Sequence, residues 1–284
     1  MRAQVTALAC TLPADSSQPL SRWSASELVA RVIAQKIVPR ISAATIRLWL
    51  RAERIKPWQY HCWQKSTDPR FLEKATVVLG LYEQAAKLAH RGEIVVCADE
   101  KTCMQALALT DGVCASTVDR PMRVGHRYRR RGILNLFAAL LVHRGQTMAC
   151  CEERKRFVEF QDFLRMIFGS LWCRGIRVLH LILDNGPTHA PKQIESWIAA
   201  QRLAFAVKIH WLPINASWLD QVEILFSPLQ RKALRPSHFA DREQLRQRVL
   251  GYLEQRNRHA QPIRWTYTKA DLRQDWGQHL RACA

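Results

Sequence analysis

The amino-acid sequence predicts an α/β protein: a mixed five-stranded sheet with helices, preceded by a small all-α domain. Up to about residue 90 the apolar residues recur at helical spacing, whereas beyond Arg91-Gly92 short apolar runs alternate with amphipathic segments. Two of those runs end on an acid, Asp99 and Asp184. An apolar run that closes on a carboxylate is typical of a central strand whose end carries a site.

The charge balance indicates a polyanionic partner. Forty-three Lys and Arg against 24 Asp and Glu give a net charge of +19 and a pI near 10.1. Such a surplus favours nucleic acid, and an Arg-rich soluble protein without that role is the alternative. Nine cysteines without a CxxC pair predict a reducing compartment and argue against zinc. We expect a soluble cytoplasmic protein with no signal peptide, membrane span or membrane partner.

Residues 21–90 are predicted to hold two short helices and a connector helix, after a loose tail at residues 1–20. A capping box that begins at Ser24 opens the first short helix, and Ser42 caps the second. Their inward-facing residues are expected to be Leu28, Val29, Val32, Ile33, Ile46, Trp49 and Leu50.

Two short helices joined by a tight turn are typical of a helix-turn-helix, although a plain helical hairpin has the same pattern. The second helix would expose Thr45, Arg47 and Arg51. A basic, aromatic run at residues 54–63 follows, and its cations suit phosphate groups. We therefore predict that Thr45, Arg47 and Arg51 contact DNA.

Beyond residue 91 strands and helices follow one another. Strands are predicted at residues 93–99, 104–109, 133–142, 177–184 and 205–211, and helices at residues 153–171, 190–200 and 218–234. Three strands followed by alternating helices and strands is the element order of a ribonuclease-H-like fold. We place this domain at residues 91–260 and a C-terminal tail at residues 261–284.

Three carboxylates are the candidate catalytic and metal-binding residues. Parallel central strands would bring Asp99 and Asp184 to one edge of the sheet, and Glu223 lies in an amphipathic segment that would dock there. Because neighbouring strand residues face opposite sides, Glu100 is not expected to serve the same site as Asp99. An all-oxygen site of this kind suits Mg²⁺, with Mn²⁺ as a substitute.

A pair of such ions, about 3.5–4 Å apart, can clamp the attacking and leaving oxygens of a phosphoryl transfer. The attacking group is then water or a DNA 3′-hydroxyl, so the protein needs no nucleophile of its own. This agrees with a sequence that shows no convincing Ser-His-Asp or Cys-His pattern.

Each acid also has a structural interpretation when taken alone. Asp99 would serve as a strand-end cap or ion-pair partner, and the sequence Asp184-Asn-Gly favours a turn. Glu223 would pair with Arg231 or Lys232 on its own helix.

Asp220 lies three residues before Glu223, on the same face of the predicted helix, so either acid remains open as the third ligand. Ser217 is predicted to be the N-cap of that helix. His189, five residues after Asp184, would either orient a phosphate or water or make a local hydrogen bond.

A basic run lies ahead of the third predicted strand. By default it is a solvated loop, but beside an acidic metal site it would hold DNA phosphates. The candidate DNA-binding residues in it are Arg127, Arg129, Arg130 and Arg131.

The segments CADEKT, LILDNGPTHAPK and ASWLDQVEILFSPLQRK, around Asp99, Asp184 and Glu223, resemble the catalytic blocks of bacterial insertion-sequence transposases. The resemblance is to the six-thirty family, a branch of the mariner superfamily, and covers roughly residues 22–270. RYRRRGILNLFAALL resembles its second- to third-strand region, and the stretch from RWSASELVARVI to RIKPWQ resembles one of its helix-turn-helix modules. The resemblance implies a Mg²⁺-dependent DDE endonuclease whose acidic triad falls on these three residues.

That family cuts DNA at terminal inverted repeats and joins the freed ends to a TA target. The chain departs from it in having Asp220 where members usually have Asn, and in having room for about one helical module where members have two. We predict a transposase that binds inverted-repeat ends and target DNA as a homodimer. The alternatives are a truncated, non-catalytic DNA-binding relic or transposition repressor, and a structure-specific nuclease that cuts without joining.

Overall fold

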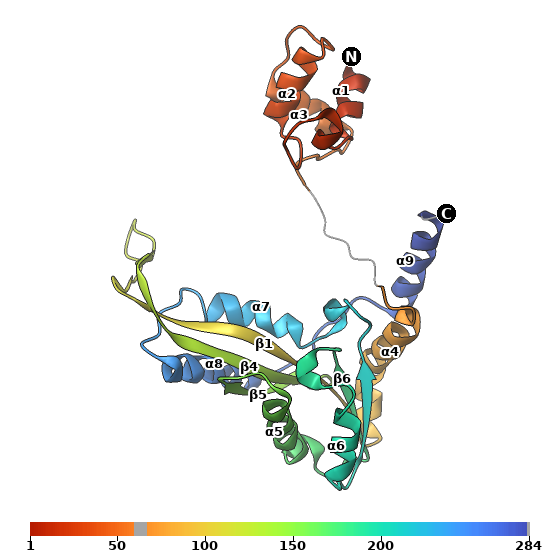
Figure 1. Cartoon of the computed structure of the whole chain (residues 1–284), viewed down its shortest axis with the longest axis vertical. Helices are drawn as coiled ribbons and strands as arrows, with labels where there is room; N and C mark the ends of the chain where they lie inside the picture. Colours follow the sequence, from red (N-terminus) through yellow and green to blue (C-terminus); the bar gives the residue numbers. More distant parts are fainter. Residues whose placement is uncertain (60–66, 283–284) are drawn as a thin grey trace. The chain divides into compact units, whose positions relative to one another are not determined.

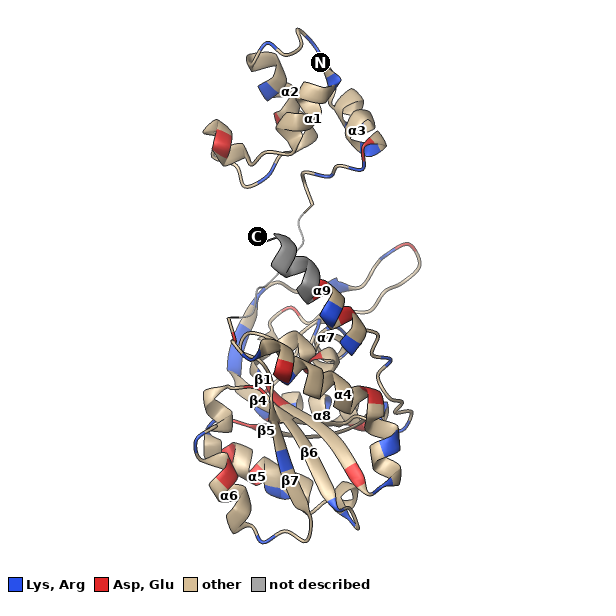
Figure 2. Cartoon of the chain, turned by 90° about the vertical axis from the view of Figure 1, so that its right-hand side faces the viewer, with Lys and Arg blue, Asp and Glu red and all other residues tan. Residues whose placement is uncertain are grey.

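The computed structural model describes residues 1–59 and 67–282 of the 284-residue chain, so residues 60–63 of the predicted basic, aromatic run lie outside the described residues. The chain divides into two compact units, Met1–Lys65 and Ser66–Ala284 (Figure 1). Lys and Arg residues occur in both units (Figure 2). Within the described ranges, no helix combines the length and the apolar character needed to cross a bilayer.

The first unit is a small group of helices. They are α1 (Arg2–Ala9), a 3₁₀ turn η1 (Pro13–Ser16), α2 (Ala25–Ala34) and α3 (Ala43–Ala52). Both predicted caps are confirmed. Ser24 and Glu27 exchange the two hydrogen bonds of a capping box, and the Ser42 hydroxyl accepts a hydrogen bond from the Thr45 amide.

The prediction that residues 1–20 form a loose tail is wrong. Helix α1 packs on the unit, and its Val5 and Leu8 are buried in the same core as Leu28 and Ile46. An eight-residue helix depends on such tertiary contacts, because its local sequence alone is too short to stabilise it. The prediction that Ile33 faces inward is also wrong, since this side chain is 39% exposed at the margin of the buried face.

The second unit is built on a five-stranded mixed sheet, in the order β5-β4-β1-β6-β7. Its strands are β1 (Glu93–Leu109), β4 (Tyr128–Leu141), β5 (Gln146–Glu152), β6 (Val178–Leu183) and β7 (Ala206–Trp211). The pairs β1–β4 and β4–β5 are antiparallel, whereas β1–β6 and β6–β7 are parallel. The predicted fold class is therefore confirmed.

One strand was divided in the prediction and another was missed. The runs at residues 93–99 and 104–109 both belong to β1, which pairs with β4 through a register shift between Lys101 and Met104. Cys103 has a φ of 55° at this irregularity, as expected of a bulge. The strand that the prediction missed is β5, whose residues show no regular alternation of buried and exposed positions.

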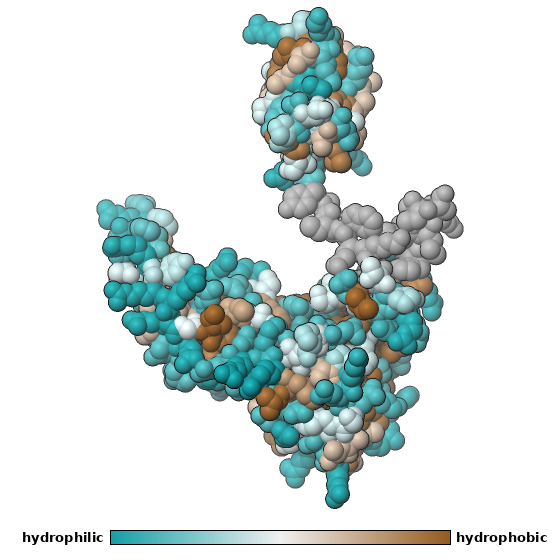
Figure 3. Space-filling model, in the orientation of Figure 1, coloured by the Kyte–Doolittle hydropathy of each residue, from teal (hydrophilic) through white to brown (hydrophobic). Residues whose placement is uncertain are grey.

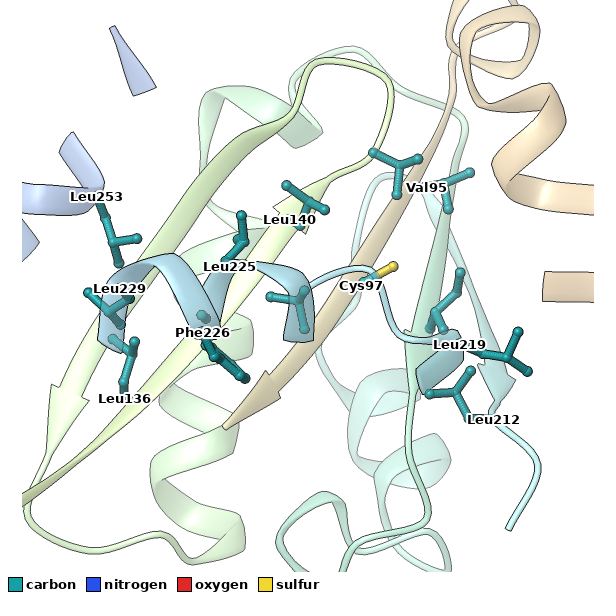
Figure 4. Close-up of a cluster of buried hydrophobic side chains, with 14 of the residues drawn as sticks. Val95, Cys97, Leu136, Leu140, Leu212, Leu219, Leu225, Phe226, Leu229 and Leu253 are labelled. Atoms are coloured by element: carbon teal, nitrogen blue, oxygen red, sulfur yellow. The ribbon is translucent and has the colours of Figure 1, made fainter. Parts of the chain in front are cut away.

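Helices cover both faces of the sheet. They are α4 (Phe71–His90), α5 (Phe157–Phe168), α6 (Ile194–Ala200), α7 (Glu223–Lys232), α8 (Arg242–Asn257) and α9 (Lys269–Ala282), with 3₁₀ turns η2 (Leu171–Cys173), η3 (Pro187–His189) and η4 (Ser217–Leu219). Alternate β1 residues enter two cores: Val95 and Cys97 pack with α4, α7 and α8 (Figure 4), and Val96 and Ala98 pack with α5 and α6.

The limits of the predicted parts also change. The connector helix placed in residues 21–90 is α4, which belongs to the second unit and buries Val78 and Leu79 against the sheet. The predicted C-terminal tail contains α9, whose Leu272 enters the same core. These helices are ordered by apolar partners that lie far away in the sequence, which no local pattern reveals.

The long helix predicted around Glu223 is divided in two. Turn η4 ends at Leu219, α7 begins at Glu223, and Asp220 lies between them with extended backbone angles. Oδ1 of Asp220 accepts a hydrogen bond from the Val222 amide at 3.0 Å, which closes a turn and interrupts the helix. Ser217 is therefore not the N-cap of α7, and Asp220 and Glu223 do not share a helix face.

Strands β1 and β4 continue beyond the rest of the sheet as a protruding arm, residues 107–131 (Figure 1). Its outer part carries the two short strands β2 (Val113–Cys114) and β3 (Arg123–Val124), and its surface is mainly hydrophilic (Figure 3). Next to the base of the arm, Gly132 has a φ of 121°, and a Cβ there would lie 2.6 Å from the Arg242 side chain. Glycine therefore allows α8 to pack against the strand at this point.

Candidate active site

Asp99 and Asp184 lie at the same edge of the sheet. Strands β1 and β6 are parallel neighbours, and Cys97 is paired with Ile182. Asp99 and Asp184 each lie two residues beyond this pair. Parallel strands thus bring together two acids that are far apart in sequence, as predicted.

Glu223 and Asp220 come to the same region from the loop and helix that follow β7. Glu223 is the partly buried first residue of α7, whereas Asp220 is 1% exposed. The charges of Asp184 and Glu223 both act on Asp220, and that of Asp220 acts on Asp99. The structure therefore gathers four carboxyl groups, the three predicted residues and Asp220, around one end of the sheet.

Two of these carboxyl groups favour the protonated form. Burial, followed by the charge of Asp220, raises the pKa of Asp99 to about 8. Burial, with the charges of Glu223 and Asp184, also raises the pKa of Asp220 to about 8. Oδ2 of Asp220 is buried and has no hydrogen-bond partner among the described residues. At Asp99 and Asp220 the unfavourable effects of burial and of neighbouring carboxylates are therefore not offset by an ion pair among the described residues.

The carboxylate of Asp184 is compensated by a histidine. Nδ1 of His189 lies 2.6 Å from Oδ1 of Asp184, and its Nε2 lies 3.3 Å from Oε2 of Glu100. Burial alone would lower the pKa of His189, but its contacts with these two acids raise it to about 10. In turn, although burial opposes it, the histidine lowers the pKa of both Asp184 and Glu100.

Glu100 is the residue that sequence reasoning excluded. Its carboxylate, that of Asp99 and a nitrogen of His189 have atoms that all lie within 4.8 Å of one another. The alternation rule fails here because Asp99 turns back to accept a hydrogen bond from the Glu100 amide at 2.7 Å. For His189, the hydrogen bond to Asp184 supports the local interpretation over the contact with a phosphate or water.

Of the structural roles predicted for single acids, the described residues show the turn at Asp184 but not the ion pair of Glu223. The Asp184 turn forms, since the Gly186 amide donates to Oδ1 of Asp184 at 2.8 Å. By contrast, the described residues contain no ion pair between Glu223 and Arg231 or Lys232. Glu223 is therefore not held as a helix ion pair.

The chemistry of this site suits a divalent cation. The donors are carboxylate oxygens, the orphaned buried Oδ2 of Asp220 lies among them, and within the described part of the chain neither Asp99 nor Asp220 forms an ion pair. Buried carboxylates without a counter-charge are costly, and hard cations such as Mg²⁺ prefer oxygen ligands.

Of the three residues predicted to contact DNA in the first unit, two are exposed and one takes part in a helix cap. Arg47 and Arg51 are exposed on α3, beside the exposed Leu48. Thr45 is partly buried, and its Oγ1 lies 2.9 Å from the Ser42 hydroxyl, so it takes part in the helix cap.

The predicted arginines of the second unit lie on the arm rather than beside the acids. Arg129 is paired with Ala108, and Asp99 with Ala138, so nine residues of β4 separate the two levels, about 30 Å at the rise of a strand. Arg127 is engaged with Asp111 at 2.6 Å, whereas the described residues show no ion pair for Arg129, Arg130 or Arg131.

A mixed sheet of this order, with carboxylates just beyond the point where the parallel strands β1 and β6 cease to pair, defines a ribonuclease-H-like protein with an acidic site. The chain belongs to the DDE superfamily endonucleases, whose family model matches residues 94–246. No curated protein sequence matches the chain significantly.

Solved structures of the Mos1 transposase are similar to the chain. Its pre-cleavage transpososome matches with a TM-score of 0.54 and 14% identity, over 89% of this chain and 71% of that chain. The strand transfer complex gives 0.55 and 14%, over 89% and 70%. The mariner Mos1 paired end complex with Mg gives 0.51 and 15%, over 90% and 72%. At this identity the likeness shows the fold.

Proposed function

We propose that the chain is a DNA transposase that cleaves DNA at terminal inverted repeats and transfers the 3′ ends to target DNA by two-metal phosphoryl transfer. One observation carries the proposal: in a DDE superfamily endonuclease, parallel strands place Asp99 and Asp184 at one sheet edge, where Glu223 enters from α7. The similarity to the Mos1 strand transfer complex supports the joining step.

Asp99, Asp184 and Glu223 are the proposed catalytic residues and the ligands of Mg²⁺, or of Mn²⁺ in its place. When bound, such ions activate the attacking hydroxyl and stabilise the charge that develops on the phosphate. The protein holds the three carboxylates on separate elements, Asp99 within β1, Asp184 directly after β6 and Glu223 at the start of α7, and so fixes their spacing before DNA binds. Asp99 is also only 7% exposed, which limits the access of water to its side chain.

Two other parts of the chain, the first unit and the arm of the second, are proposed to bind DNA. The first unit, with Arg47 and Arg51 exposed on α3, is proposed to recognise the inverted repeats, with Thr45 fixing the start of the helix. The exposed arginines of the arm are proposed to hold phosphates remote from the cleaved bond, because the arm extends about 30 Å from Asp99.

Three further features are proposed by analogy with the six-thirty family that the sequence resembles. They are an origin in a bacterial insertion sequence, a cytoplasmic, nucleoid-associated location, and assembly as a homodimer on DNA. The paired end complexes of Mos1 support the last of these.

Cleavage of DNA that carries the inverted repeats flanking the gene tests the function. The intact chain is expected to nick and join this DNA with Mg²⁺. Asp184→Asn and Glu223→Gln are each expected to reduce nicking by about 10³-fold or more, while DNA affinity changes less than about twofold, because the acids act on the reacting phosphate.

The outcomes separate the competing functions. If the intact chain binds the repeats without cutting them, it is a DNA-binding relic or repressor. If it cuts without joining, it is a structure-specific nuclease. If Asp184→Asn or Glu223→Gln cuts at the normal rate, the assignment of the acids is wrong.

A further inference from the structure

Beneath the acids lies a connected set of contacts, Asp184–His189–Glu100, to which the proposed function gives no role. Nδ1 of His189 is 2.6 Å from Oδ1 of Asp184, and its Nε2 is 3.3 Å from Oε2 of Glu100. The second contact is not aligned as a hydrogen bond and acts as an ion pair. The histidine therefore joins the end of β6 to β1.

The His189 side chain is held on all sides. It has no exposed surface, and its ring lies 4.5 Å, centroid to centroid, from that of Phe160 on α5. Glu100 is itself fixed, because its Oε1 accepts a hydrogen bond from the Thr188 hydroxyl at 2.8 Å and lies 3.8 Å from Nζ of Lys155. Such packing leaves the imidazole one orientation.

The contacts of Asp184 are unequal at its two oxygens. Oδ1 accepts hydrogen bonds from His189 and from the Gly186 amide, while the described residues show no hydrogen bond to Oδ2. The side chain is 38% exposed, in contrast to the fully buried histidine. One oxygen is thus fixed by the protein and the other is left for a ligand.

The compact group of Asp99, Glu100 and His189 allows a different assignment, in which the histidine itself binds a metal ion. The geometry argues against it. Both ring nitrogens already face carboxylates, and the buried ring cannot turn to release either one. A hard cation such as Mg²⁺ also prefers the carboxylate oxygens that are available nearby.

We propose that His189 is a positioning residue: it fixes Oδ1 of Asp184, and Glu100 fixes His189, so that Oδ2 of Asp184 faces the bound divalent ion. The proposal rests on the proposed function for its catalytic consequence, but ion binding can be measured without catalysis. Partners of metal ligands commonly change metal affinity or activity by about 10–100-fold when they are removed.

The test uses the full chain and measures Mn²⁺ binding by titration calorimetry beside Mg²⁺-dependent cleavage. His189→Ala is expected to weaken Mn²⁺ binding and slow cleavage by about 10–100-fold each. His189→Asn, whose amide can replace Nδ1 as the donor to Asp184, is expected to recover most of the loss. Glu100→Gln, which keeps the volume of the side chain, is expected to lose about tenfold.

His180 provides a matched control. It is also buried on β6 and contacts a glutamate, with its Nε2 lying 3.1 Å from Oε2 of Glu93, but it precedes Asp184 by four residues and does not contact it. His180→Asn is expected to leave Mn²⁺ binding unchanged. Circular dichroism and thermal melting show which variants fold. If His189→Ala does not fold, Glu100→Gln is used to test the proposal.

The results separate the two proposals. If the intact chain binds Mn²⁺ without cleaving DNA, and His189→Ala weakens that binding, the positioning role stands and the proposed function fails. If the chain cleaves DNA and neither His189→Ala nor Glu100→Gln affects binding or rate, the positioning role is overturned. A His189→Asn variant that binds no better than His189→Ala also overturns it. An intact chain that binds no divalent ion refutes both.

Discussion

The two sides of the acidic site differ in how their negative charge is compensated. Asp184 and Glu100 share a buried histidine, and the pKa of each carboxyl is below its usual value despite burial. Among the described residues Asp99 and Asp220 form no such ion pair, and burial together with repulsion from neighbouring carboxylates raises both pKa values to about 8. At Asp184 and Glu100 the protein itself supplies the compensating positive charge, whereas a cation from solution would stabilise Asp99 and Asp220.

The arm repeats this contrast with the opposite sign. Arg127 is compensated by Asp111 at 2.6 Å, while its neighbours Arg129, Arg130 and Arg131 have no acidic partner among the described residues. Uncompensated charge therefore marks the surfaces proposed to take a ligand, a cation at the acids and phosphates on the arm. Four substitutions test this comparison.

Asp99→Asn is expected to have the largest effect. It removes a proposed ligand, so cleavage should fall by about 10³-fold or more. Without divalent ions the same variant should be more stable, by roughly 1 kcal/mol, because a repelled buried carboxyl is lost. Gel-based nicking and chelator-treated thermal melts measure the two effects. A variant that is inactive and also less stable would contradict the comparison.

Gly186→Ala tests the compensated side. A Cβ at this position would lie 2.8 Å from Oδ1 of Asp184, so the carboxylate must move away from its two donors. We expect cleavage to fall by about 10–100-fold, as for other residues that orient a metal ligand, with DNA affinity unchanged. Gly251→Ala, on α8, is the control, because a Cβ there would meet no atom within 4 Å. Gly175 also has open space around it, but its φ of 73° would add backbone strain to an alanine. Normal cleavage by Gly186→Ala would show that the placement of Oδ1 is unimportant.

Arg130→Ala should weaken DNA binding by about threefold and lower the slope of log affinity against log salt by about 1, as for one phosphate contact. Arg127→Ala is the matched control on the same arm, and its smaller effect follows from its pairing with Asp111. Fluorescence anisotropy at several salt concentrations measures both. Equal slopes for the two variants would remove the distinction between paired and unpaired arginines.

Asp220→Asn should have the smallest effect on activity, with cleavage within about threefold of the intact chain, because Glu223 is the proposed third ligand. Its stability should change with pH. The folded pKa of Asp220, about 8, exceeds that of an unfolded aspartate, so the carboxyl increasingly destabilises the metal-free fold as the pH rises from about 4 to 8. The variant should therefore gain stability at pH 8, by roughly 1–3 kcal/mol, and little near pH 4. Thermal melts with a chelator measure this, and loss of cleavage would instead make Asp220 a ligand.

Local signals in the sequence predicted the features that depend on a few neighbouring residues. The caps at Ser24 and Ser42 form as expected, and so does the turn after Asp184. Apolar runs ending in acids also predicted that Asp99 and Asp184 would meet, because parallel strands align their ends. The sequence by itself thus determined the fold class and the meeting of Asp99 and Asp184 at one end of the parallel strands.

Only the tertiary structure decided the partners of those acids. Helix α1 and strand β5 are ordered by packing and pairing that their own residues do not reveal. Asp220 leaves the predicted helix because its side chain bonds the backbone two residues on, and Glu100 reaches His189 only because β1 and β6 lie side by side. These contacts between residues far apart in sequence depend on how the layers pack, and the local patterns around Asp220, Glu100 and β5 did not indicate them.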